Sequence, residues 1–151
     1  MNDITSKTLA VAISQIGVRE ATGHNDGPQV ETYLKSIGLG KGYSWCMAFV
    51  YWCTLQAANA LNRRTPLVKT GGVLNQWETT LCHRTQIPTA GCIFIIDEGK
   101  GLGHTGFVES VAGDLIHTIE GNTNNDGSRE GIGVFRRVRT IKSIKGFIEL
   151  A

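Results

Sequence analysis

A cysteine followed by a long apolar helical segment constrains this 151-residue chain more than any other feature. From Cys46 to about Asn62 there is no glycine or proline, and apolar side chains occur at nearly every position around the predicted helix. A helix that is apolar on most sides is buried, and about seventeen residues span roughly 25 Å, the width of a small domain. We therefore expect the rest of the fold to pack around this segment.

Cys46 is predicted to lie in the first turn of that helix, after the loop Gly42-Tyr43-Ser44-Trp45. The first N–H groups of a helix have no intrahelical partner, and the helix dipole adds partial positive charge there. Both effects favour the nucleophilic thiolate, and the same N–H groups can stabilise an oxyanion. Cys46 is thus a candidate nucleophile for acyl transfer. Taken alone, it is explained better as a small core residue, because free cysteines are often buried and inert.

Composition and charge exclude several classes of protein. A net charge of +2 is too small to indicate nucleic-acid binding, and no apolar run is long enough to cross a membrane. The N-terminus does not have the pattern of a signal peptide, and the four cysteines lack the CxxC spacing of a zinc site. We expect synthesis in the cytoplasm with reduced thiols, no cofactor or metal, and one monomeric domain over residues 1–151.

The order of the predicted elements indicates an α+β domain, with N-terminal helices packed on a C-terminal antiparallel β-sheet. Glycine-rich and polar segments at 97–103 and 121–131 are predicted to be a turn and a loop. Helices are predicted over 4–16, 28–37 and 46–62, with a short one near 72–77. Strands are predicted over 92–96, 104–112, 115–120, 133–138 and 143–150.

Two polar segments have an alternative interpretation. The loop with Glu20, Asn25 and Asp26 has oxygen ligands suited to calcium but not the spacing of a known calcium loop, so turn formation and capping are favoured. A basic run near the C-terminus could bind an anionic wall polymer, but we favour its interpretation as a solvated strand edge. The run comprises Arg136, Arg137, Arg139, Lys142 and Lys145.

His104 is the best candidate for a base that would activate a cysteine. It stands between glycines in Gly101-Leu102-Gly103-His104-Thr105-Gly106, and small neighbours allow another element to come close. Glu120 and Asn122 are two residues apart and share one face of a strand. A carboxylate beside His104 would fix its tautomer, whereas the structural alternative is a strand end entering a turn.

The register of the hairpin decides whether His104 and Glu120 can meet. With a two-residue turn at Gly113-Asp114 and no irregularity, Glu120 would project from the opposite face of the sheet, because a one-residue shift reverses every side chain. With one extra residue, His104 faces Asn122 and Gly106 faces Glu120. A catalytic triad therefore requires a β-bulge or an odd loop in this hairpin.

Three segments together resemble the CHAP domain, a family of the NlpC/P60 superfamily of papain-like cysteine hydrolases. Weaker similarity is found in Ile16–Glu20 and Asp126–Gly131. The resemblance covers most of the chain and implies a papain-like fold. The three segments are Trp45–Trp52, Gly103–Val108 and Ile119–Asn124.

The resemblance also implies an activity, namely cysteine-dependent hydrolysis of an amide bond in bacterial peptidoglycan by an amidase or an endopeptidase. Cys46 would be the nucleophile, His104 the base, Glu120 its orienting partner and Asn122 a further site residue. Trp45 and Trp77 are candidates for binding substrate, although core packing is the expected role of at least one.

Two other functions stay open at this point. One is a catalytically silent wall-binding module of the same fold, and the other is a papain-like protease or deamidase toxin that acts on proteins. Action in the cell wall or periplasm would require phage lysis or non-classical export. An immunity or inhibitor protein and a delivery machinery are further conceivable partners that the residues do not identify.

Overall fold

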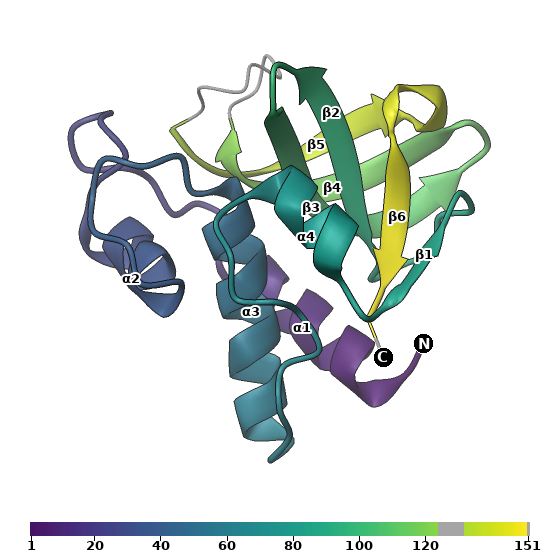
Figure 1. Ribbon diagram of the computed structural model, residues 1–151, viewed down its shortest axis with the longest axis horizontal. Helices are drawn as coiled ribbons and strands as arrows, with labels where there is room; N and C mark the ends of the chain where they lie inside the picture. The colour runs from purple at the N-terminus through teal and green to yellow at the C-terminus, as the bar shows by residue number, and fades with distance from the viewer. Residues whose placement is uncertain (124–131, 151) are drawn as a thin grey trace.

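Helices come first and strands follow in the computed structural model, which describes residues 1–123 and 132–150 (Figure 1). This arrangement confirms the α+β class. The helices are α1 (Asp3–Ser14), α2 (Pro28–Ser36), α3 (Cys46–Ala60) and α4 (Val73–Thr79), and the short 3₁₀-helix η1 is Ile141–Ser143. The strands are β1 (His83–Thr85), β2 (Ile93–Gly99), β3 (Leu102–Ala112), β4 (Leu115–Thr123), β5 (Gly133–Thr140) and β6 (Gly146–Glu149).

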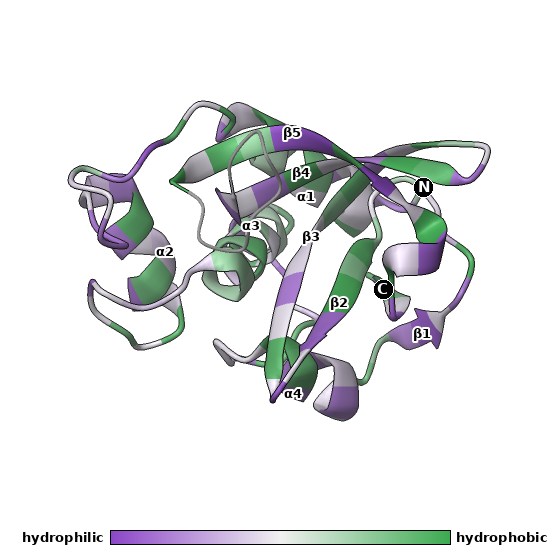
Figure 2. Cartoon of the chain, turned by 90° about the horizontal axis from the view of Figure 1, so that it is seen from above, coloured by the Kyte–Doolittle hydropathy of each residue, from purple (hydrophilic) through white to green (hydrophobic). Residues whose placement is uncertain are grey.

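The strands form one antiparallel sheet in the order β1-β6-β2-β3-β4-β5. Figure 1 shows α1, α2 and α3 gathered beside the sheet, while α4 lies across β2 and β3. The larger hydrophobic cluster joins the helices to Phe107 and Ile119, and a smaller cluster around Phe94 and Phe147 covers the opposite sheet face. Hydrophilic residues are prominent on the edge strands β1 and β5 (Figure 2).

Helix α3 is the central helix of the fold, as its apolar sequence predicts. Most of its residues are buried, and it packs against α1, α2, β3 and β4. Tyr33 of α2 contacts the rings of Trp45, Phe49 and Trp52 at centroid distances of 5.1–5.7 Å. These contacts fix the direction in which the N-terminus of α3 points. None of the described helices combines the length and apolar character that crossing a membrane requires.

Gly121 allows the start of α3 to lie directly on β4. A Cβ atom at this position would be 2.8 Å from Phe49 Cβ and 2.9 Å from Trp45 Cζ3, closer than real Cβ contacts. A side chain here would push the helix away from the strand that carries Glu120. The glycine between Glu120 and Asn122 thus sets the distance between the helix N-terminus and the sheet.

The β3–β4 hairpin contains the irregularity that a triad requires. Ala112 pairs with Leu115 across the Gly113-Asp114 turn, but the register shifts between Val108 and Ser110. Glu109 is the extra residue, and beyond it Phe107 pairs with Ile119. The predicted β-bulge is therefore confirmed, and it returns Glu120 to the face of the sheet that carries His104.

Several element boundaries differ from the prediction. Strand β1 was not predicted, because three exposed or half-exposed residues have no apolar pattern. The turn within 97–103 shortens to Lys100-Gly101, both with positive φ, and β4 continues to Thr123 into the predicted polar loop. The remainder of that loop, 124–131, which includes the whole of the segment Asp126–Gly131, lies outside the described residues.

Candidate active site

Cys46 is the first residue of α3 and follows Trp45, the N-cap. Trp45 makes no side-chain capping bond, and the first turn contains no acidic residue. The first N–H groups of this helix therefore have no intrahelical acceptor, and the first turn itself contributes no carboxylate to them. Their direction and partial charge suit an oxyanion next to Cys46.

Trp45 holds the start of the helix in place. Its indole Nε1 donates a hydrogen bond of 2.7 Å to Glu20 Oε2, and its ring stacks on Tyr33 at 5.7 Å. The side chain is completely buried. The ring is fully covered in this structure, and substrate binding by Trp45 stays a prediction. Its role is to anchor the residue before Cys46.

His104 lies on β3 and contacts Glu120 through one ring nitrogen. The distance from Nε2 to Glu120 Oε1 is 2.8 Å, and both side chains are almost fully buried. An ionised carboxylate only accepts hydrogen bonds, so Nε2 carries the proton. The other nitrogen, Nδ1, is buried and has no hydrogen-bond partner among the described residues, while the Cys46 thiol lies close enough to act on the ring. The imidazole is thus held by the carboxylate through Nε2, and Cys46 is a second group that acts on it.

The electrostatics of this group favour a charged pair. Burial acts to lower the pKa of His104, but hydrogen bonds and charge from Cys46 and Glu120 raise it to about 9. Burial acts to raise the pKa of Glu120, but bonds from Arg139 and His104 lower it to about 2. At neutral pH, His104 therefore carries a proton next to an ionised Glu120.

Glu120 has two further partners that sequence reasoning missed. Arg139 donates to both carboxylate oxygens, from Nε at 2.6 Å and from Nη2 at 2.7 Å, and Thr118 Oγ1 donates at 2.6 Å. Arg139 was assigned to a solvated strand edge, but its side chain is only 16% exposed. The alternation of Phe135, Arg137 and Arg139 on one face of β5 was the available signal.

Asn122 follows Glu120 on β4 in a left-handed conformation, with φ of 55°. It is fully buried, and the pairing of β4 with β5 shifts between Glu120 and Thr123. Asparagine tolerates positive φ better than most residues, which accounts for this residue type at the irregularity. Its participation in the site stays a prediction.

A protein-family model described as the CHAP domain matches residues 38–122, more than half of the chain. This chain belongs to the CHAP domain family. The matched region contains Cys46, His104, Glu120 and Asn122, whereas Arg139 lies beyond it.

Solved structures share the fold of this CHAP domain. The crystal structure of Ly7917 is 17% identical with a TM-score of 0.56, and the match covers 97% of this chain and 62% of that one. Ly7917 with the hydrolysing product of MDP matches with 16% identity, a TM-score of 0.56 and the same coverage. PlyC matches with 16% identity and a TM-score of 0.55 over 98% of this chain and 36% of that one. The chain thus spans less than two thirds of either protein. Curated protein sequences give no match.

The other cysteines of the CHAP domain lack a comparable environment. Burial raises the pKa of Cys53, and burial raises that of Cys92 to about 11. Cys82 Sγ donates to the carbonyl of Pro66. Protonated, buried thiols are poor nucleophiles. Cys46 is the cysteine that combines a helix N-terminus with an adjacent histidine.

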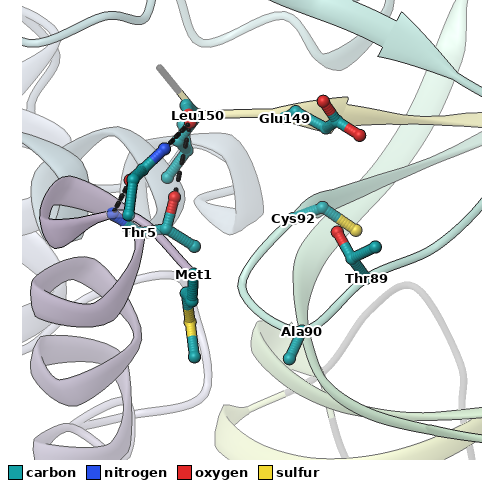
Figure 3. Close-up of a pocket in the computed structure, with 8 residues that line it drawn as sticks. Met1, Thr5, Thr89, Ala90, Cys92, Glu149 and Leu150 are labelled. Atoms are coloured by element: carbon teal, nitrogen blue, oxygen red, sulfur yellow. Dashed lines mark hydrogen bonds between the residues drawn. The ribbon is translucent and has the colours of Figure 1, made fainter.

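A cavity near the two chain termini does not coincide with Cys46. It has a volume of about 530 Å³ and is lined by residues near the two chain ends, including Thr5, Cys92 and Glu149 (Figure 3). Asn2 Nδ2 and Thr5 Oγ1 are both donors to the Leu150 carbonyl at its rim. None of the predicted catalytic residues lines this cavity.

Trp77 and the Glu20 loop complete the predicted site residues. Trp77 is half-buried on α4, packs over Gly146 and lies 5.3 Å from the Arg84 guanidinium, so its role in substrate binding stays a prediction. Glu20 accepts the Trp45 bond, and Asp26 accepts two bonds from Thr22. These carboxylates hold the loop itself, as capping and turn formation predict. The described residues contain no cluster of three metal-ligating side chains.

Proposed function

We propose that this CHAP domain hydrolyses an amide bond in bacterial peptidoglycan through a thioester on Cys46. One observation carries the proposal: Glu120 holds His104 at 2.8 Å through one nitrogen, and the Cys46 thiol acts on the same imidazole. Family membership supports the substrate class, and Ly7917, which shares the fold, has been solved with the hydrolysing product of MDP. The wall or periplasm is then where the enzyme acts.

The chemistry follows from the positions of these groups. The Cys46 thiolate attacks the amide carbonyl, and N–H groups at the start of α3 stabilise the oxyanion. The His104 imidazolium gives its proton to the leaving amine as the C–N bond breaks. His104 then takes a proton from water, which attacks the thioester, so that the carboxylate leaves and the thiolate returns. The reacting groups come from α3, β3 and β4, and we propose that residues 1–151 act as one catalytic domain.

Digestion of purified peptidoglycan tests the proposal. The wild-type protein is expected to release fragments whose masses show one new amine and one new carboxylate, either beside muramic acid or within the peptide stem. Protein treated beforehand with iodoacetamide is expected to release none, because alkylation removes the nucleophile. Wall binding without cleavage would instead indicate a silent binding module. Cleavage or deamidation of a protein substrate with no wall product would indicate a protein-directed enzyme.

The rate is expected to depend on pH on the alkaline side. The pKa of His104 is raised to about 9, so the proton needed by the leaving amine is present below that value and lost above it. We expect kcat/KM to fall about tenfold per pH unit above about 9. The measurement is soluble product released per minute at low substrate concentration. A decline that begins near 6.5, the ordinary value for histidine, would contradict the assignment.

A further inference from the structure

Arg139 is a charged residue outside the predicted triad that contacts it directly. It reaches Glu120 from the neighbouring strand β5, through two hydrogen bonds of 2.6 and 2.7 Å that form a parallel fork. The Glu120 side chain is fully buried and that of Arg139 is 16% exposed. Planar two-point contacts of this kind fix orientation as well as charge.

Glu120 accepts four hydrogen bonds, and together they fix the orientation of its carboxylate. Oε1 accepts from His104 and Arg139, while Oε2 accepts from Arg139 and Thr118. The Arg139 guanidinium also lies 5.6 Å from the centre of the Phe94 ring, which in turn lies 6.0 Å from the His104 ring. Rotation of the carboxylate would break contacts on every side, so Oε1 stays directed at Nε2.

Charge balance gives Arg139 a second role. The reactive state places two anions, the Cys46 thiolate and the Glu120 carboxylate, beside one imidazolium in a buried site. One cation cannot balance both, and burial of an uncompensated charge is costly. Arg139 supplies the second cation, and Glu98 is the further acidic group whose charge acts on it.

We infer that Arg139 is a positioning residue that holds Glu120 ionised and aimed at His104, and thereby keeps Cys46 reactive at neutral pH. This inference rests on the proposed function for its meaning, but its main readout requires no wall substrate.

The test measures how fast iodoacetamide alkylates Cys46 between pH 4 and 9, followed by mass on the Cys46 peptide. We expect Arg139→Met to lower the rate at pH 7 at least about tenfold and to move the acidic limb to higher pH, because only the thiolate reacts. Arg139→Lys keeps the charge but loses the fork, and should recover only part of that rate. The matched control is Arg136→Met on the same strand, which removes an exposed pair with Glu109 and should leave the profile unchanged.

Wall digestion then separates action through Glu120 from an independent effect. Arg139→Met should lower kcat/KM about 10- to 100-fold in the wild-type background and about threefold or less in the Glu120→Gln background, since residues acting as one unit are not additive. Full additivity, or a wild-type alkylation profile in Arg139→Met, would overturn the inference. If Arg139→Met does not fold, Arg139→Lys provides the test. We expect loss of the fork in Arg139→Lys to lower kcat/KM about tenfold, and a wild-type kcat/KM in this variant would overturn the inference. Failure of wall cleavage with an altered alkylation profile would contradict only the proposed function.

Discussion

Replacing Cys46 by alanine is expected to reduce the release of wall fragments by at least about 10⁴-fold, because removal of the nucleophile leaves only binding and oxyanion stabilisation. The fold should persist, since alanine fits the first turn of a helix and the removed sulfur is small. Quantifying fragments by mass, with far-ultraviolet circular dichroism as the check on folding, provides the measurement.

A matched variant makes the Cys46 result specific. Cys53→Ala makes the same chemical change in the same helix, at a residue that is completely buried two turns after Cys46. We expect near-normal cleavage and a modest loss of stability from the small cavity. If Cys46→Ala keeps more than a tenth of the activity, the thioester mechanism is wrong. Equal losses in both variants would indicate a packing effect.

Replacing Glu120 by alanine is expected to lower the free energy of unfolding by about 3–5 kcal/mol as well as activity, because Arg139 would keep a buried, uncompensated charge. The lowered pKa of Glu120 contributes stability that is fully present above its ordinary value of 4.5 and is lost as the pH falls toward about 2. Urea denaturation at pH 7 therefore measures the whole effect.

The exposed pair between Glu109 and Arg136 provides the comparison. It has similar two-point geometry, at 2.9 and 3.0 Å, but the Arg136 side chain is 56% exposed. Glu109→Ala should cost under about 1 kcal/mol, because solvent screens an exposed ion pair and hydrates the remaining charge. Similar losses in the two variants would show that burial of the Glu120 pair has no energetic consequence, contrary to the argument for Arg139.

The predictions that hold from sequence depend on local pattern. The all-round apolar run after Cys46 predicted α3, because periodicity and the absence of glycine and proline act within one element. The bulge was predicted from parity: His104 and Glu120 can share a face only if one residue is extra. Its location at Glu109 was not predictable, since any residue between them would have served equally well.

The contacts between distant residues were decided by the tertiary structure. Tryptophan is a residue type that often binds substrate. In this structure, however, Gly121, Tyr33 and Glu20 surround Trp45 from three other segments. Arg139 belongs to a basic run that is typical of a solvated strand edge. Only the pairing of β5 with β4 brings its guanidinium to Glu120.

The sequence by itself determined the elements, the cysteine at the helix N-terminus and the need for an irregular hairpin, because these follow from interactions between residues near one another in the chain. Only the tertiary structure decided which charges share the buried site. Burial and hydrogen-bond geometry depend on how the helices and strands pack. An arginine on one face of β5 is a solvated cation, whereas an arginine on the other face, Arg139, is the partner of Glu120.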